Sequence, residues 1–231
     1  MELKKDGDVH ILTLTNGKEQ NSLTDSVIEE FHGVLDTLER YEGNTALIIK
    51  SSDGKCWNTG VNLKWIANRP ADYMNQFRGM LEKMLLRFAV LNMPTVGCLN
   101  GHAYGIGAML AITLDFRFMR ADRGFICFPA IDHHRSYSLI LHQVLDLLPN
   151  RMALTELLLT GKRIGGMEAQ EKKVVTAAYA LDELWSKSIA WAQMLAAKDR
   201  QTYSTIKLNM RKPLVESWKM LQGKRIGLRR A

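Results

Sequence analysis

Apolar and polar positions in the first half of the chain follow two periods, which predict strands and helices in alternation. Short runs rich in β-branched side chains fit strands, and the run at 45–50 is apolar almost throughout, so we expect it to be covered on both faces. Longer stretches with apolar side chains at helical spacing fit helices. The first can be capped by Thr24, or by Ser26 in a Ser-x-x-Glu capping box, and the second ends before Pro94. The predicted strands cover 9–15, 45–50, 94–99, 116–120 and 125–128, and the predicted helices cover 24–38, 73–91 and 108–114.

The second half of the chain shows the helical period alone. From Ser136 onward, apolar stripes at helical spacing are interrupted mainly by Pro149 and Gly161. Strands that alternate with helices early, followed by helices late, are typical of an α/β fold with a helical C-terminal region. We therefore expect a mixed core over residues 1–135 and a helical region over 136–231.

Composition narrows the class of protein. The 231 residues suffice for a sizeable core, and 46% apolar with 24% charged residues is usual for a globular protein. No run of about 18 apolar residues is present, which predicts no membrane span. The start of the chain lacks a hydrophobic signal segment, and Cys56, Cys98 and Cys127 stand far apart in apolar surroundings, which fits reduced core thiols. We therefore expect a cytoplasmic protein.

The net charge of +7 belongs to the end of the chain. From Arg200 onward there are nine basic residues against one acidic residue, Glu216, whereas the preceding 199 positions hold 22 basic and 23 acidic residues. A basic segment of this kind can contact nucleic acid, a polyphosphate ligand or an acidic neighbour. Because aromatic and basic residues do not interleave there, a solvated segment is the preferred interpretation, and nucleic-acid binding is not expected.

Glycines crowd residues 100–107, between a predicted strand and a predicted helix. A turn that opens a helix leaves backbone N–H groups unpaired, and the helix dipole favours negative charge there. Such a turn can hold a phosphate or a developing oxyanion. The pattern is not a dinucleotide fingerprint, because the third glycine of that motif would fall at Leu110.

A second segment can supply a donor to the same oxygen. In residues 56–64, Gly60 lets the chain turn and exposes the N–H of Val61, while Ile106 stands between two glycines at the helix start. Two converging N–H groups form an oxyanion hole, in which each donor lowers a reaction barrier by about 3 kcal/mol.

Four motifs follow one another along most of the chain, at 20–23, 58–63, 94–115 and 157–175, and three shorter ones lie at 52–55, 101–103 and 119–124. In this order and spacing, the four motifs resemble the crotonase (enoyl-CoA hydratase/isomerase) superfamily. The three shorter motifs resemble its plant-type Δ3,Δ2-enoyl-CoA isomerases.

The resemblance implies a spiral of ββα units that carries an acyl-CoA site, with the C-terminal helices as a trimerisation region in a homotrimer or hexamer. It implies that the thioester oxygen of an acyl-CoA lies between the N–H groups of Val61 and Ile106. Coenzyme A would belong to the substrate, with no separate cofactor, metal or membrane partner. The residues implied in binding it are Asn58, Gly60, Asn62, Leu63, Lys64 and Gly105.

The chain departs from the superfamily at its proton-transfer positions. Hydratases of the superfamily use two glutamates, and this sequence has Met109 at the first position and Ala130 at the second, which isomerases also use. Neither side chain can carry a proton. Asp132 is a candidate substitute base, since two residues further along an extended segment it would point the same way as Ala130. His133 and His134 fit surface or interface positions better than a metal site.

The sequence leaves three hypotheses for function. The leading one is an enoyl-CoA isomerase-like enzyme that shifts a double bond through a stabilised thioester enolate. The second is an acyl-CoA-binding or assembly protein that has lost proton transfer, with Ala130 as a natural or an engineered replacement of glutamate. The third is an enoyl-CoA hydratase-like protein with a basic RNA-binding tail.

Overall fold

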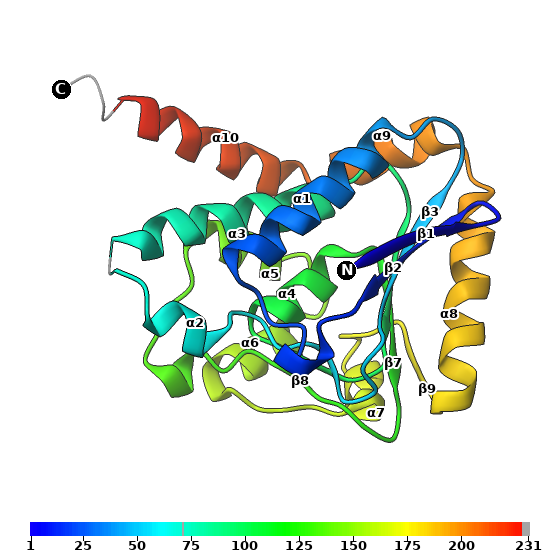
Figure 1. Cartoon of the computed structure of the whole chain (residues 1–231), viewed down its shortest axis with the longest axis horizontal. Coiled ribbons are helices and arrows are strands. Elements are labelled where there is room, and N and C mark those ends of the chain that lie inside the picture. Colours follow the sequence, from blue (N-terminus) through cyan, green and yellow to red (C-terminus); the bar gives the residue numbers. More distant parts are fainter. Residues whose placement is uncertain (71, 228–231) are drawn as a thin grey trace.

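A six-stranded sheet crosses the molecule in the computed structural model, which describes residues 1–70 and 72–227 and, up to residue 222, their side chains (Figure 1). Its strand order is β1-β2-β3-β5-β7-β9, and every neighbouring pair is parallel except β1 and β2. The strands are β1 (Glu2–Asp6), β2 (Val9–Leu14), β3 (Ala46–Ser51), β5 (Thr95–Leu99), β7 (Phe116–Arg120) and β9 (Ala177–Tyr179).

A smaller parallel sheet continues from the carboxyl ends of three of these strands. It consists of β4 (Cys56–Asn58), β6 (His102–Tyr104) and β8 (Ile126–Cys127), which follow β3, β5 and β7 along the chain. Two strands followed by a helix therefore recur, with the helices at residues 25–40, 73–89, 106–113 and 139–145 after the strand pairs β1-β2, β3-β4, β5-β6 and β7-β8. This repetition is the spiral of ββα units expected from the sequence.

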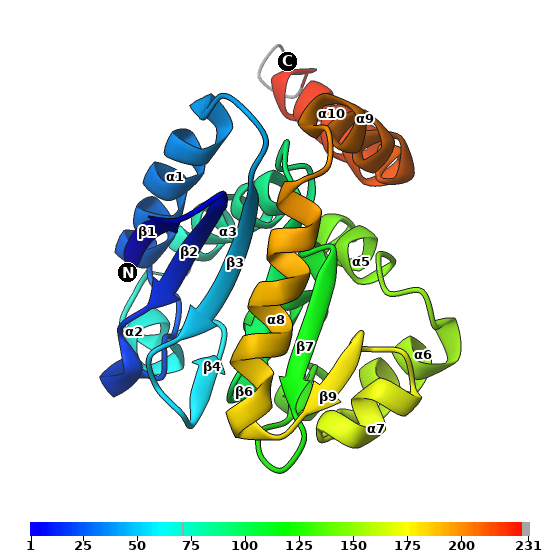
Figure 2. The same ribbon diagram turned by 90° about the vertical axis from the view of Figure 1, so that its right-hand side faces the viewer.

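Helices cover both faces of the large sheet (Figure 2). On one face α1 (Asp25–Arg40), α3 (Tyr73–Ala89), α4 (Ile106–Thr113) and α5 (Leu139–Leu145) enclose the larger hydrophobic core, which includes Phe31, Trp57 and Phe88. On the other face α8 (Leu181–Ala196) buries Leu184 and Ala192 against the sheet. Burial on both faces explains the continuous apolar run of β3.

Shorter elements complete the chain. Two of these elements, η1 and α2, lie in the N-terminal half. The helix at residues 212–227, labelled α10 and red in Figure 1, extends away from the rest of the molecule. None of the helices in the described residues is long and apolar enough to cross a membrane. The remaining elements are the 3-10 turns η1 (Gly17–Glu19) and η2 (Ile131–His133) and the helices α2 (Leu63–Ala67), α6 (Arg151–Thr160), α7 (Gly166–Glu171), α9 (Arg200–Met210) and α10 (Lys212–Gly227).

Four strands were not predicted from the sequence. β1 is an edge strand of mostly polar residues, so it lacks the apolar pattern used to find strands. β4, β6 and β9 have three residues each, too few to show a period. Because β9 pairs with β7, the prediction that residues 136–231 contain helices alone is wrong, and this part of the chain contributes to the main sheet.

Thr24, not Ser26, caps α1. The Thr24 side chain accepts a hydrogen bond from the N–H of Val27 at 3.4 Å, and Ser26 lies inside the first turn of the helix. We expect Thr24→Ala to lower the free energy of unfolding by about 1 kcal/mol. Urea denaturation of Thr24→Ala and Ser26→Ala measures this; an equal or larger loss in Ser26→Ala would show that the capping box is the active cap.

Candidate active site

A tight turn after β4 brings the loop at residues 58–63 against the start of α4. Gly60 has φ +78°, and its N–H donates to Oδ1 of Asn58 at 2.8 Å. A Cβ atom on Gly60 would lie 2.7 Å from the carbonyl oxygen of Tyr104 and 3.0 Å from the nitrogen of Ile106. Only glycine tolerates both this φ and this close approach.

The first turn of α4 approaches the loop at residues 58–63 equally closely. Gly105, with φ +51°, forms the turn into the helix. A Cβ atom on Gly107 would lie 2.2 Å from the carbonyl oxygen of Asn58 and 2.4 Å from its Oδ1. The two segments therefore meet at van der Waals distance through glycine backbone on both sides.

Where the loop at residues 58–63 meets the start of α4, the N–H groups of Val61 and Ile106, like that of Gly107 next to it, have no protein acceptor among the described residues. Leu23 pairs with the loop by donating to the Gly60 oxygen at 2.7 Å and accepting from the Asn62 N–H at 3.0 Å, so the N–H of Val61 faces away from Leu23. Ile106 is the first residue of α4, where N–H groups have no partner within the helix. The junction can therefore offer two donors to one oxygen.

Asparagine side chains hold the two segments in place. The Asn100 Nδ2 donates to the carbonyl oxygens of Ser51 (3.0 Å) and Asp53 (3.1 Å), and its Oδ1 accepts from the Ser51 N–H at 3.1 Å. The Asn21 Nδ2 donates to Oγ of Ser51 at 2.8 Å and to the carbonyl of Cys56 at 3.2 Å. These contacts tie the end of β5 and residue 21 to the β3–β4 connection, which sets the position of the loop at Gly60.

The residues expected to bind coenzyme A fall into two groups. Asn58 is 1% exposed and supports the Gly60 turn, and Asn62 caps α2 by accepting from the N–H of Trp65 at 2.9 Å, so both have a structural role. Leu63 and Lys64 are exposed. Among the described residues no ion pair involves Lys64, which leaves its ammonium group available to an anion.

Neither position of the expected glutamates carries a proton-transfer group. Met109 lies one turn into α4 and is fully buried. Ala130 is half-buried and directly precedes η2, with helical backbone angles of φ −60° and ψ −37°.

The expectation that Asp132 shares the direction of Ala130 is wrong, because the segment is not extended. In the tight turn of η2, residues two apart point in different directions. The Asp132 carboxylate instead packs against the end of α6, where a Cβ atom on Gly161 would lie 2.4 Å from its Oδ2. His133 and His134 are exposed, as expected.

His102 and Tyr104 form a packed aromatic pair beside the junction. The His102 Nδ1 accepts from the N–H of Phe125 at 3.2 Å and contacts the Tyr104 hydroxyl at 2.8 Å. Burial, with the nearby Lys55 and Arg123, lowers the pKa of His102. Hydrogen bonding and packing therefore account for this pair.

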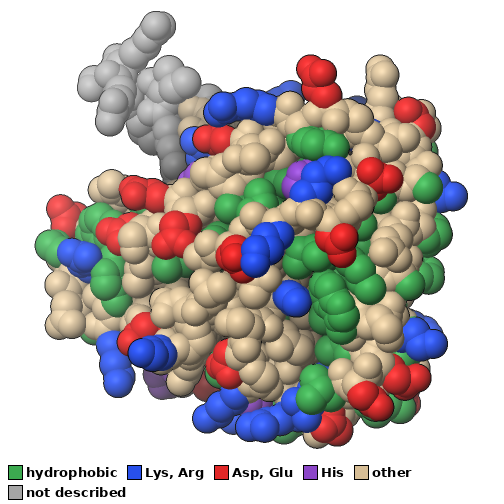
Figure 3. Space-filling model, turned by 45° about the vertical axis from the view of Figure 1, so that its right-hand side comes forward, with side chains coloured by type: hydrophobic (Ala, Val, Ile, Leu, Met, Phe, Trp, Pro, Cys, Tyr) green, Lys and Arg blue, Asp and Glu red, His purple; other side chains and the backbone are tan. Residues whose placement is uncertain are grey.

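Two of the nine C-terminal basic residues, Arg200 and Lys207, are buried and Arg211 is half-buried, which corrects the interpretation of a wholly solvated basic segment. Arg200 donates to the carbonyls of Leu38 (3.0 Å) and Asn92 (2.7 Å). Lys207 Nζ and Arg211 Nη2 lie 2.8 and 2.7 Å from the carboxylate of Asp115. Elsewhere acidic side chains stand among the basic ones, as over most of the face in Figure 3. The basic residues Lys224, Arg225, Arg229 and Arg230 lie outside the described side chains.

The cysteines are free and buried, as the sequence predicts. Burial raises the pKa of the Cys98 and Cys127 thiols to about 11. Within residues 1–70 and 72–227, no group of three or more His, Cys, Asp or Glu side chains is placed to hold a metal ion.

The ββα spiral and the paired N–H groups define an α/β protein whose junction can accept one anionic oxygen. The family model described as enoyl-CoA hydratase/isomerase matches residues 4–222. The chain belongs to this family.

Curated relatives and solved structures agree with this assignment. The chain is 30% identical over 228 residues to the peroxisomal enoyl-CoA delta isomerase 2 of Arabidopsis thaliana, covering 90% of each chain, and 28% identical over 218 residues to enoyl-CoA delta isomerase 3 of the same plant. The structure of an enoyl-CoA hydratase/isomerase family protein from Pseudomonas syringae matches with a TM-score of 0.86 at 20% identity, covering 95% of this chain and 93% of that one. The crotonase fold expected from the sequence is confirmed.

Proposed function

We propose that the protein binds an enoyl-CoA with its thioester oxygen between the N–H groups of Val61 and Ile106, and shifts the double bond of the acyl chain. The observation that carries this proposal is the pair of N–H groups without protein acceptors, held together by Gly60 and Gly107. Two relatives that cover 90% of the chain are named enoyl-CoA delta isomerases, which supports isomerisation over hydration.

The chemistry follows from polarisation of the thioester. Hydrogen bonds to the carbonyl oxygen, with the dipole at the start of α4, stabilise the negative charge that forms when a proton leaves the α-carbon. Hydration through two glutamates is not supported, because Met109 and Ala130 occupy those positions. Coenzyme A enters as part of the substrate, and the exposed Lys64 is proposed to contact one of its phosphates.

The oligomeric state of the protein and its cellular compartment remain predictions. Exposed apolar side chains on α9 and α10, among them Ile206, Met210 and Met220, support a homotrimer or hexamer formed through the C-terminal helices. The cytoplasm was expected from the sequence, whereas related proteins are named peroxisomal or mitochondrial.

Removing one N–H donor tests the proposal. Ile106→Pro deletes the N–H at the first position of α4, where proline fits a helix, while Ile106→Ala keeps it and shortens the same side chain. We expect the rate of conversion of 3-enoyl-CoA to 2-enoyl-CoA to fall by about 100-fold or more in Ile106→Pro relative to Ile106→Ala. Turnover followed by chromatography, with melting temperatures of both variants, measures the difference. Equal rates in two folded variants would contradict a role for this N–H.

A binding protein without turnover is the second candidate, and the methyl and thioether side chains at positions 130 and 109 favour it. It predicts that acyl-CoA raises the melting temperature of the protein while 3-enoyl-CoA persists unchanged. A hydratase-like protein with an RNA-binding tail loses support, because Arg200 and Lys207 are buried within the fold and Arg211 is paired with Asp115.

A further inference from the structure

The small sheet begins where four backbone segments lie side by side. The N–H of His102 donates to the carbonyl oxygen of Lys55 at 2.8 Å, which joins the start of β6 to the residue before β4. On its other side β6 pairs with β8, and the N–H of Ile126 donates to the carbonyl oxygen of Ile164 at 2.9 Å. A Cβ atom on Gly101 would lie 2.5 Å from the backbone oxygen of Lys55. The segments around residues 55, 102, 125 and 164 therefore form one closely packed edge, which we call the turn edge.

The turn edge carries three exposed basic side chains, those of Lys55, Arg123 and Arg163. The turn that holds Arg123 packs on the start of β6, because a Cβ atom on Gly124 would lie 3.1 Å from the backbone oxygen of Gly101. Among the described residues, none of the three basic side chains forms an ion pair. Their three positive charges therefore have no bonded counter-charge.

The acidic side chains around the turn edge have other roles. The Asp53 carboxylate accepts from two backbone N–H groups of its own turn, at 3.0 and 3.3 Å. The Asp122 carboxylate accepts from the Arg120 guanidinium at 2.6 and 2.7 Å. Asp132 packs against the end of α6 and belongs to no ion pair of the described residues. Positive charge is therefore in excess at this edge, and it favours an anion.

A stack of aromatic rings accompanies the basic side chains. The His102 ring contacts those of Phe125 and Tyr104, with centroids 5.5 and 5.0 Å away. The planes of Phe125 and His102 differ by 23°, so one face of the Phe125 ring is covered, while the residue is 41% exposed. The Arg163 guanidinium lies 5.6 Å from the centre of the Tyr104 ring and approaches the Cys127 thiol, and both of these partners are neutral. A second planar ring can stack on the open face of Phe125.

His102 adds a hydrogen-bond donor to the turn edge. Its Nδ1 accepts from the N–H of Phe125 at 3.2 Å, so the proton of the neutral ring is on Nε2. Burial lowers the pKa of His102, and the charges of Lys55, Arg123 and Arg163 lower it further. All three cations therefore act on one imidazole, which keeps the ring neutral and shows that their charges converge.

We propose that the turn edge is a binding site for a nucleoside diphosphate. The phosphates contact the side chains of Lys55, Arg123 and Arg163, and the base stacks on Phe125. An inorganic anion would use the cations alone, whereas the exposed ring beside them favours a ligand that also has a planar aromatic group. Two sources can supply this chemistry: a free nucleotide, or the nucleotide part of a coenzyme A.

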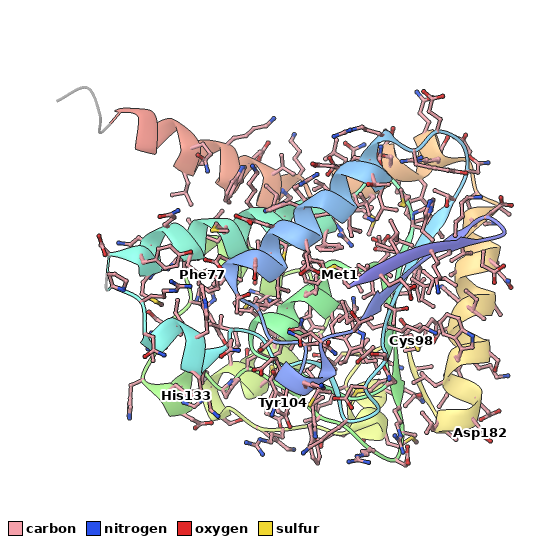
Figure 4. All side chains as sticks on the ribbon, viewed as in Figure 1. Met1, Phe77, Cys98, Tyr104, His133 and Asp182 are labelled. Atoms are coloured by element: carbon pink, nitrogen blue, oxygen red, sulfur yellow. The ribbon has the colours of Figure 1, made fainter. Side chains whose placement is uncertain are left out.

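This site is distinct from the proposed place of the thioester. It lies at the start of β6, whereas Ile106 follows the end of that strand. In Figure 4 the labelled Tyr104 of β6 lies in the lower part of the molecule, away from the C-terminal helices α9 and α10 at the top of the same view in Figure 1. The site therefore does not use the basic C-terminal segment, and it does not depend on the proposed isomerisation.

Calorimetric titration of the whole protein with ADP, pyrophosphate and adenosine separates the two kinds of contact. We expect ADP to bind about 10-fold more tightly than either of the others, because pyrophosphate lacks the base and adenosine lacks the phosphates. Binding of ADP is expected to weaken as the salt concentration rises. A further titration with acyl-CoA present identifies the source: additive binding indicates a free nucleotide, and competition indicates the nucleotide part of coenzyme A.

Arg123→Gln and Phe125→Ala are the decisive variants, and Lys187→Gln on the exposed face of α8 is the charge-matched control. We expect each decisive variant to weaken ADP binding by about 10-fold. Phe125→Ala should leave pyrophosphate binding unchanged, whereas Arg123→Gln should weaken it as well. Arg123→Gln alone serves if Phe125→Ala lowers the melting temperature. Lys64→Gln shows whether ADP instead uses the lysine proposed to contact coenzyme A.

Three results would overturn the nucleotide site. The first is no binding of ADP at concentrations up to about 1 mM, or equal binding in the decisive variants and the control. The second is adenosine that binds as tightly as ADP, which would leave the cations without a role. The third is loss of ADP binding in Lys64→Gln with the decisive variants unaffected, which places ADP at the coenzyme A site and leaves the proposed function standing. Conversely, ADP binding at the turn edge without any effect of acyl-CoA on melting would overturn the proposed function alone.

Discussion

Alanine at position 107 is expected to abolish acyl-CoA binding and to lower the free energy of unfolding by about 3 kcal/mol or more. The added Cβ atom would lie 2.2 Å from the backbone oxygen of Asn58, 2.4 Å from its Oδ1 and 2.7 Å from its backbone carbon. Two of these atoms are backbone, so the clash is relieved only by moving the loop away from α4. That movement separates the N–H of Val61 from that of Ile106 and removes their shared acceptor position.

Gly33→Ala provides the matched control for this substitution. Gly33 lies within α1, and a Cβ atom there would meet nothing within 4 Å, so alanine is expected to stabilise the protein by up to about 1 kcal/mol. Urea denaturation and the melting shift with acyl-CoA compare the two variants. A Gly107→Ala protein as stable as the unmodified one, and still responsive to acyl-CoA, would show that the two segments do not need this close approach.

Asp115→Asn is expected to lower the free energy of unfolding by about 3–5 kcal/mol. The Asp115 carboxylate is held by the Lys207 and Arg211 side chains and accepts from the Thr95 N–H at 2.9 Å and from the Tyr203 hydroxyl at 3.2 Å. An amide of the same shape leaves the buried Lys207 and the half-buried Arg211 without their counter-charge. Asp36→Asn, which breaks a solvent-exposed pair with Arg87, is the control and should change stability little.

The same carboxylate gives stability a predictable dependence on pH. Burial alone would raise the pKa of Asp115, but Lys207 and Arg211 outweigh it and hold the pKa below its usual 3.8. A group with a lower pKa in the folded state contributes stability above its unfolded pKa and loses it as pH falls through the folded one. Denaturation between pH 6 and pH 2 should therefore show a loss of stability at about pH 4 and below, and this loss should be smaller in Asp115→Asn. Identical pH profiles would contradict the charge network.

The glycine positions of the site were predictable because they are local. A turn at Gly60 and a glycine turn that opens the next helix can be recognised from a few neighbouring residues, and the structure has both turns. The start of α4 was predicted two residues late, since its first turn contains Gly107 and its N-cap, Gly105, has no capping side chain. Helix propensity and capping signals are both weak in such a start.

Long-range pairing limits what the rest of the sequence can show. Glu82 stands on a helical pattern next to Lys83, as a solvent-facing carboxylate would, yet it is buried and accepts from Ser138 at the start of a later helix. From the sequence alone, Lys207 and Arg211 were interpreted as solvated charges, because their partner, Asp115, lies 92 and 96 residues earlier in the chain. Spacing along a sequence carries no information on contacts of this kind.

The hydrogen bonds of Arg211 bear on the order in which parts of the fold can form while the protein is being synthesised. Its guanidinium joins the ends of α3 and α4, which leave the ribosome 122 and 98 residues before it, counted from Ala89 and Thr113. Until Arg211 emerges, both carbonyl groups lack this donor, and the register between the two helices is not locked. All strands of the sheet precede Arg211 in the chain, so the sheet can form first and these two helix ends are joined only when the last helices are made.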